Sequence, residues 1–272
     1  NHRILFAFQE IFPYLKDSHM AKIGRYLPQG IQEKNNEIRT FMPRYGCINE
    51  RRNQLHEVIR LSGMNIIIDD KDNPLIIKVA SIQSARMQVY FIHNEEYFQR
   101  KYMLFDKENK PFKDNDERMI FFCRGVLETV IKLSWSPTII SAHGWISSLL
   151  PIYLKTAFSE NPFFSDTKVV FTVYDENNCS NNLKNFHNKI ETEGMTKEQL
   201  EEFKNLDFIG MMKKSIDYSD GIVIGSENIH PELKEYIDSM RDKKPVMDPP
   251  DEDNFIDMYS DFFDSVQENV LV

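Results

Sequence analysis

Three polar segments of this sequence border predicted strands or helices and carry side chains that could do chemistry. His143 follows a continuously apolar run, where its imidazole could hydrogen-bond a sugar hydroxyl or move a proton. Lys16 and Ser18 precede a predicted helix, whose free N–H groups and dipole favour an anion such as phosphate. Asp114 opens an Asp-Asn-Asp-Glu-Arg segment that leads into another helix. The structural alternatives are a buried histidine, a solvated lysine beside an ordinary N-cap, and helix capping by Asp116.

Helices and strands must position these segments, and the hydrophobic pattern predicts an α/β fold. Short β-rich runs alternate with amphipathic stretches, which is typical of βαβ units and a doubly wound, mostly parallel, Rossmann-like sheet. Ligands of such sheets bind beyond the carboxyl ends of the strands, so the loops after the strands are where a site is expected. The predicted strands are residues 3–8, 37–41, 64–68, 75–80, 87–92, 138–142, 168–174 and 221–224, with a hairpin turn at 69–74. The predicted helices are residues 18–34 with Ser18 as N-cap, 117–133, 145–158, 196–204 and 255–266, and residues 177–207 are expected to form a surface excursion.

Composition excludes several classes of protein. The 272 residues carry a net charge of −9 and a pI near 5.4, which argues against nucleic acid or an anionic membrane as a partner. The longest apolar runs, such as residues 169–173, are too short to span a bilayer, so no membrane anchor is expected. Cys47, Cys123 and Cys179 form no CxxC pair, so neither a disulfide framework nor a metal site is predicted. No signal peptide is recognisable from Asn1 onward, and the unpaired cysteines favour a cytoplasmic protein; no cofactor is expected.

Five segments, taken in order, resemble motifs of the glycogen and starch synthase family. Residues 3–16 (RILFAFQEIFPYLK) resemble the family's opening strand and its SE-x-x-P-[FY]-x-K loop. Residues 37–46 (EIRTFMPRYG) and 114–122 (DNDERMIFF) resemble its EVRVxxPRYG and DNxxRFxxF segments. Residues 137–155 resemble its PDIIHxHDWHxxLxPxYLK segment, and residues 168–174 (KVVFTVY) resemble its KxVFTIHN strand.

The resemblance implies a retaining glucosyltransferase with two Rossmann-like halves facing each other across a cleft. Such an enzyme transfers glucose from a nucleotide-glucose donor to an α-1,4-glucan; ADP-glucose is the donor we expect, and the sequence leaves UDP-glucose open. Residues 1–226 correspond to the first half, whereas the donor-binding second half has no counterpart in this sequence. The resemblance implies catalytic roles for His143 and Asp114, donor-phosphate binding by Lys16 and Ser18, and positions on the acceptor side for Trp145 and Tyr174.

Departures from the family pattern leave more than one function open. Residues 17–20 read Asp-Ser-His-Met where the family has Thr-Gly-Gly-Leu, whose glycines let the backbone approach the phosphates. Residues 227–272 are expected to pack on the same domain, with aromatic residues of the last helix covering apolar surface. The first hypothesis is a glucosyltransferase, completed by a homo-oligomer or a donor-side partner. The alternative is a non-catalytic glucan-binding or regulatory relic of that family.

Overall fold

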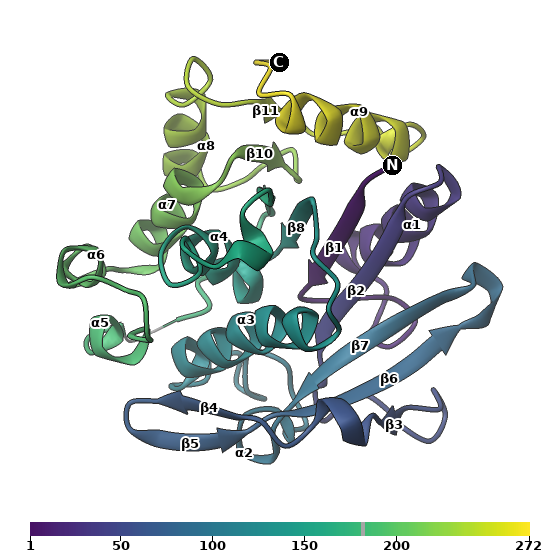
Figure 1. The fold of residues 1–272 in the computed structure, drawn as a ribbon, viewed down its shortest axis with the longest axis vertical. Helices are drawn as coiled ribbons and strands as arrows, with labels where there is room; N and C mark the ends of the chain where they lie inside the picture. Colours follow the sequence, from purple (N-terminus) through teal and green to yellow (C-terminus); the bar gives the residue numbers. More distant parts are fainter. Residues whose placement is uncertain (181–182) are drawn as a thin grey trace.

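The computed structural model describes residues 1–180 and 183–272, and its centre is one large, mostly parallel sheet (Figure 1). Within the described residues the sheet has nine strands in the order β11-β10-β9-β8-β1-β2-β7-β6-β3. Neighbours from β11 to β7 pair in parallel, and β6 and β3 extend the edge in antiparallel fashion. The strands are β1 (Arg3–Phe8), β2 (Glu37–Pro43), β3 (His56–Glu57), β6 (Ile76–Ile82), β7 (Met87–His93), β8 (Ile139–His143), β9 (Lys168–Val173), β10 (Gly221–Ile224) and β11 (Val246–Met247).

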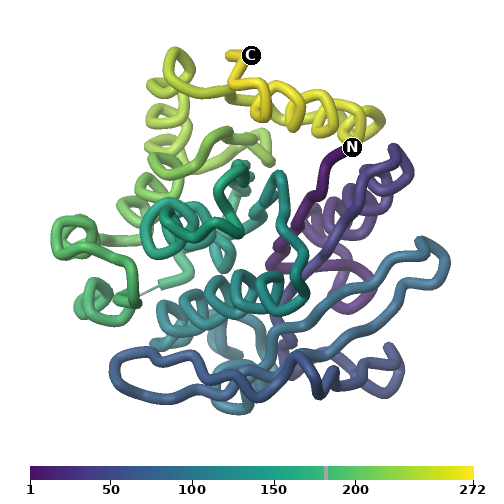
Figure 2. The backbone as a smooth tube through the Cα atoms, in the orientation of Figure 1, coloured from purple at the N-terminus to yellow at the C-terminus, as the bar shows by residue number. Residues whose placement is uncertain are grey.

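Helices cover both faces of the sheet, as the backbone trace shows (Figure 2). On one face α1 (His19–Glu33) packs beside α9 (Phe255–Gln267), so the C-terminal helix lies against the first helix of the chain. On the other face α3 (Asn115–Lys132), α4 (Leu149–Lys155) and α7 (Phe208–Tyr218) pack in a row, with α8 (Pro231–Asp238) beside α7. The remaining elements are the hairpin β4 (Asn65–Ile68) and β5 (Lys71–Pro74), the short helices α2 (Glu95–Phe98), α5 (Phe186–Lys189) and α6 (Lys197–Glu201), and 3-10 turns at Ile59–Leu61, Gln83–Ala85, Trp145–Ser147 and Pro162–Phe164.

The predicted fold class is confirmed, and several elements lie where the pattern put them. Strands β1 and β10 have the predicted bounds. Every residue of β10, and every residue of β1 except Arg3, is buried because the sheet is covered on both faces. Ser18 is the N-cap of α1, since its backbone is extended and its hydroxyl accepts a hydrogen bond from the Ala21 N–H at 3.1 Å.

Some predicted details are wrong, each for a local reason. Asp116 does not cap α3: Asp114 occupies the N-cap position without a side-chain cap bond, and Asp116 is buried in the first turn. The predicted helix over 145–158 is a 3-10 turn followed by the shorter α4, whose first turn accommodates Pro151 because its missing N–H is not needed there. The predicted turn at 69–74 is mostly strand, since residues 71–74 form β5 and pair with β4.

The predicted surface excursion is anchored to the core. Phe186, Ile190 and Phe203 are all buried, so this segment packs against the domain through apolar side chains despite its polar composition. Residues 181 and 182 of the excursion lie outside the described residues. Helices α7 and α8 and strand β11 were not predicted, although Met211, Met212, Ser215 and Ile216 form a buried stripe at helical spacing.

The glycine that closes the PRYG segment is required by close packing. A Cβ atom on Gly46 would overlap the backbone N and O atoms of Arg100, which no side-chain rotation can relieve. We therefore expect Gly46→Ala to lower the free energy of unfolding by about 1–3 kcal/mol, or more, through overpacking. Urea denaturation of this variant beside Cys47→Ala, at the exposed neighbouring position, measures the effect. An unfolding midpoint equal to that of the wild-type protein would show that the two backbones can separate freely.

Candidate functional site

The carboxyl ends of β1, β8 and β9 meet around one carboxyl group, that of Glu176. Gln9, just after β1, donates its side-chain N–H to Glu176 Oε1 at 2.8 Å. The backbone N–H of Trp145, just after β8, donates to Glu176 Oε2 at 3.0 Å. Gln9 Oε1 accepts from the Ile146 N–H at 3.1 Å, which ties the same two loops together again. Glu176 thus holds the three loops where a ligand is expected in a sheet of this kind.

Burial changes the chemistry of the Glu176 carboxyl group. Removal from water raises its pKa to about 8, with the Glu10 carboxylate adding to the rise and the bond from Gln9 opposing it. A carboxyl group with this pKa is largely protonated at neutral pH, so it could donate a proton or a hydrogen bond to a ligand.

The raised pKa predicts a pH-dependent stability. The folded protein retains the Glu176 proton up to about pH 8, whereas the unfolded chain releases it near the ordinary value of 4.5, so wild-type stability should fall as the pH rises between these values. Relative to wild type, the free energy of unfolding of Glu176→Gln should rise by roughly 1–3 kcal/mol between pH 5 and pH 8. Glu176 is partly exposed, and screening by solvent limits the rise to this range. Urea denaturation across this range, with Glu160→Gln as a control for the loss of one carboxylate, tests the prediction. Parallel wild-type and Glu176→Gln profiles would contradict it.

His143 lies at the end of β8 but is fully enclosed. Its Nε2 atom is 2.7 Å from the Ser141 hydroxyl, and its Nδ1 atom is 2.8 Å from the Tyr174 hydroxyl. The ring stacks on Phe8, with the ring centroids 3.9 Å apart. Burial lowers the pKa of the imidazole well below its ordinary value, which keeps the ring neutral. In this arrangement His143 can orient Tyr174 and Ser141, while solvent does not reach it.

The hydrogen-bonded groups around His143 extend to the C-terminal helix. Tyr259 of α9 hydrogen-bonds Thr172 of β9 at 3.1 Å, and its ring lies 5.9 Å from that of His143. Tyr174 is also buried, and burial raises the pKa of its hydroxyl group. Helix α9 is therefore part of the packing that encloses His143.

The predicted phosphate-binding segment is occupied by the protein's own groups. The Ser18 hydroxyl caps α1 and also donates to Glu10 Oε1 at 3.1 Å, so it is already used. His19, at one of the family's glycine positions, places its Nε2 atom 2.8 Å from the Gly225 carbonyl oxygen beyond β10. Lys16 is exposed, and within the described part of the chain it forms no ion pair.

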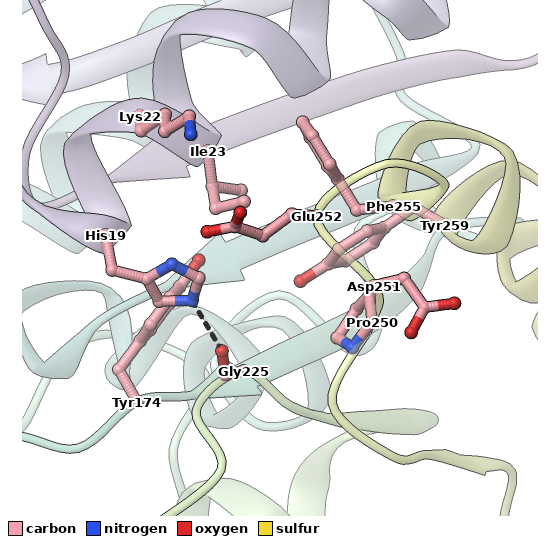
Figure 3. Close-up of a pocket in the computed structure, with 10 residues that line it drawn as sticks. All are labelled: His19, Lys22, Ile23, Tyr174, Gly225, Pro250, Asp251, Glu252, Phe255 and Tyr259. Carbon is pink, nitrogen blue, oxygen red and sulfur yellow. Dashed lines mark hydrogen bonds between the residues drawn. The ribbon is translucent and has the colours of Figure 1, made fainter.

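A segment of the C-terminal region lies beside the N-terminal turn of α1 (Figure 3). Pro250, Asp251 and Glu252 line a cavity together with His19 and the first turns of α1, and the Glu252 side chain extends toward Ile23 and His19. The cavity volume is about 30 Å³, enough for about two water molecules and far too small for a sugar or a diphosphate. We call residues 250–252 the acidic strap.

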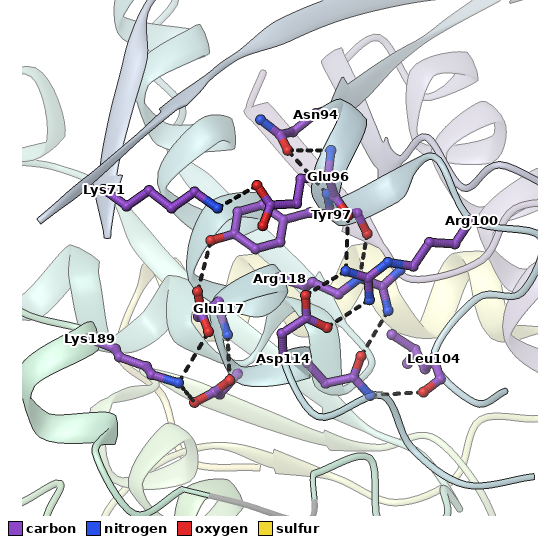
Figure 4. Close-up of polar contacts among 12 residues, drawn as sticks. Lys71, Asn94, Glu96, Tyr97, Arg100, Leu104, Asp114, Glu117, Arg118 and Lys189 are labelled. Carbon is purple, nitrogen blue, oxygen red and sulfur yellow. Dashed lines mark hydrogen bonds and ion pairs between the residues drawn. The ribbon is translucent and has the colours of Figure 1, made fainter. Parts of the chain in front are cut away.

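Asp114 belongs to a separate polar cluster at the start of α3 (Figure 4). Its carboxylate accepts a hydrogen bond from Arg100 Nη1 at 2.7 Å, and Arg100 Nη2 pairs with its other oxygen. Asn115 donates to the Cys179 carbonyl at 2.7 Å, which ties this cluster to the loop after β9. Among the described residues no hydrogen bond or ion pair joins Asp114 to His143, so the structure does not bring these two candidates into contact.

The two acceptor-side candidates also lie in the interior. The Trp145 indole is fully buried, and only the backbone N–H of this residue reaches the loop cluster through Glu176. The Tyr174 hydroxyl group hydrogen-bonds His143, and the Tyr174 and His19 rings make an edge contact. Neither side chain offers an exposed aromatic face for a sugar, because both are buried.

An open groove lies beyond the carboxyl ends of β9 and β10. Its volume is about 740 Å³, and its two walls are residues 175–178 and the segment around residues 227–234. Glu176, Asn177, Glu227 and His230 are among its lining residues, so the groove offers carboxyl, amide and imidazole groups. Such groups exchange hydrogen bonds with hydroxyl groups. Sequence reasoning missed Glu176 and this groove, although Glu176 closely follows the recognised strand segment that ends at Tyr174.

Residues 1–180 and 183–272 contain neither a membrane-spanning helix nor a cluster of metal ligands. No helix there is long and apolar enough to cross a membrane. No group of three or more His, Cys, Asp or Glu side chains in those residues could hold a metal ion. All three cysteines are free thiols.

Known proteins share this sequence pattern and fold. The family model of the starch synthase catalytic domain matches residues 3–242. Glycogen synthases of Chlorobium limicola and Chlorobium phaeobacteroides are 42% and 39% identical over 176 residues, which is 64% of this chain and 36% of each relative. The chain thus spans about a third of the length of these curated relatives.

A solved structure has the same fold. The catalytic domain of starch synthase IV from Arabidopsis thaliana, bound to ADP and acarbose, superposes with a TM-score of 0.70 at 16% identity, covering 91% of this chain and 51% of that one. The resemblance seen in the motifs is confirmed: this chain belongs to the starch synthase catalytic domain family.

Proposed function

We propose that this chain binds an α-glucan in the groove beyond β9 and β10 and does not hold a nucleotide-sugar phosphate at the N-terminus of α1. The observation that carries the proposal is the crowding of that N-terminus by the protein's own side chains, where a cavity of only about 30 Å³ lies between His19 and the acidic strap. The chain keeps the family's fold and offers a neutral sugar polymer a polar groove, while its own side chains occupy the place of the donor phosphate.

Charge supports the choice of a neutral ligand. Asp175 and Glu227 line the open groove beside Lys234, whose ammonium group is paired with Asp238. Asp251 and Glu252 line the cavity at the end of α1 together with one lysine, Lys22. Negative groups on both sides repel a diphosphate, whereas a glucan carries no charge and its hydroxyl groups can donate hydrogen bonds to carboxylates. The Arabidopsis starch synthase IV domain, which has the same fold, was solved with acarbose bound, and this supports a saccharide as the ligand class here.

Glucosyl transfer from ADP-glucose is the second candidate. It is favoured by Lys16, which is exposed in the loop before α1 at the position that the resemblance assigns to the donor phosphate. The similarity to proteins named glycogen synthase, and the ADP in the Arabidopsis structure, support it as well. In this chain the strap would have to move away from α1, and positive groups for the leaving diphosphate would have to come from a donor-side partner, a second copy or a further segment of the protein.

One experiment separates the candidates. The purified chain is incubated with glycogen and ADP-glucose, ADP release is followed, and cosedimentation with glycogen is measured in the same samples. Lys16→Ala serves as the variant because Lys16 is exposed and its removal leaves the core intact. Glycogen retention without ADP release, unchanged in Lys16→Ala, is the expected result. ADP release that falls at least tenfold in the variant would establish the transferase instead.

A further inference from the structure

A second polar groove lies at the opposite end of the sheet from the candidate site. It is bounded by the end of α1, the start of β2, and the end of the β6–β7 hairpin that includes the 3-10 turn Gln83–Ala85. Its volume is about 510 Å³, within the range of small-molecule sites. The starts of β2 and β7 are the amino ends of parallel strands, so this groove is distinct from the glucan groove at the carboxyl ends.

Two arginines in this groove lack an acidic partner. Arg39 and Arg86 both line it, and within the described residues neither forms an ion pair. No lining residue of the groove is acidic, and the nearby Glu37 is engaged with Arg3 and the Trp135 indole N–H. In a chain with a net charge of −9, a groove with two guanidinium groups and no carboxylate is a local site for an anion.

Arg39 is held in place for such a role. Its guanidinium group lies over the Trp135 ring, 5.0 Å from the centroid, and its Nη1 donates to the Ile38 carbonyl at 2.9 Å. Its Nε atom has no hydrogen-bond partner and is shielded from solvent, and the same is true of Gln32 Oε1. The Gln32 side-chain N–H donates to the Arg86 carbonyl at 3.4 Å, which ties the end of α1 to the turn that carries Arg86.

The rest of the groove suits a sugar better than a bare anion. Gln83 and Gln88 contribute amide groups, which both donate and accept hydrogen bonds, and Ser81 contributes a hydroxyl group. Tyr90 lines the groove with one ring face stacked on Phe41 at 5.2 Å. Hydroxyl groups of a sugar can both accept from and donate to the Gln83 and Gln88 amide groups, whereas a phosphate oxygen only accepts.

We infer that this groove binds a phosphorylated monosaccharide, with Arg39 and Arg86 on the phosphate and the amide groups on the sugar hydroxyls. The inference does not depend on the proposed glucan binding, because the two grooves lie at opposite ends of the sheet.

Titration calorimetry with glucose 1-phosphate and glucose 6-phosphate tests this inference, with glucose and inorganic phosphate as the two halves of the ligand. We expect at least one sugar phosphate to bind at least tenfold more tightly than either half. Arg86→Gln, at an exposed position, and Arg39→Lys, which keeps the charge but loses the fork of donors, should each weaken binding at least tenfold. Arg52→Gln, at an exposed arginine outside the groove, is the matched control and should bind like wild type.

Three results would overturn the inference. They are no heat of binding with either sugar phosphate, equal affinity for inorganic phosphate, and unchanged affinity in Arg86→Gln. Circular dichroism of each variant confirms that it is folded, and glycogen cosedimentation, which should not change in Arg86→Gln, keeps this result separate from that of the other groove.

Discussion

Replacing Phe263 with alanine is expected to lower the free energy of unfolding by about 3–5 kcal/mol, the range for deleting a buried aromatic ring. Phe263 is fully buried in α9, with its ring 6.2 Å from that of Phe6 in β1 and 5.8 Å from that of Tyr259. The chain thus brings its last helix onto its first strand, and the lost ring would leave a cavity between them.

Chemical denaturation measures this effect, with Val270→Ala at a half-exposed position after α9 as the control. Removal of residues 250–272 should have a larger effect of the same kind, because Phe262 and Val266 also pack closely on Gly221 of β10. Aggregation or loss of cooperative unfolding is the expected outcome. A truncated chain with an unchanged melting temperature would show that α9 is an accessory element.

Removing hydrogen-bonding groups from both walls of the glucan groove should strongly weaken glycogen binding. Asn177 and Glu227 lie on opposite walls, within reach of solvent. One neutral and one charged hydrogen bond contribute about 2–4 kcal/mol together, so Asn177→Ala combined with Glu227→Ala should weaken binding by roughly 30-fold or more.

Affinity gel electrophoresis with glycogen in the gel measures this loss. The matched control combines Asn65→Ala with Glu160→Ala, which removes the same residue types from exposed positions outside the groove. A double groove variant that is retarded as strongly as wild type would place the glucan elsewhere on the protein.

Much of the scaffold was predictable because its signals are local. The apolar runs of β1 and β10 and the capping residue Ser18 each determine structure within a few residues of themselves. The elements that were missed have short or mixed signals. Strand β11 has two residues, and the polar composition of 177–207 concealed Phe186 and Phe203, which anchor that segment to the core.

The site was less predictable because its decisive contacts join distant residues. The sequence shows that Ser18 and His19 replace glycines, but not that His19 reaches the carbonyl of Gly225, 206 positions away. It shows a histidine at the end of β8, but not that Phe8 and Tyr259 enclose its ring. It gives no sign that Glu176 joins three loops, because a single glutamate after a strand resembles any surface residue.

The N-terminus of α1 should exclude a nucleotide-sugar phosphate while the protein still binds glucan. Calorimetric titration of the wild-type chain with ADP-glucose, beside a titration with maltoheptaose, tests it most directly. We expect measurable binding of maltoheptaose and no saturable heat with ADP-glucose up to millimolar concentration, because the cavity beside the acidic strap has a volume of only about 30 Å³. Saturable ADP-glucose binding that is lost in Lys16→Ala would contradict it, because the strap would then have to open and admit the donor.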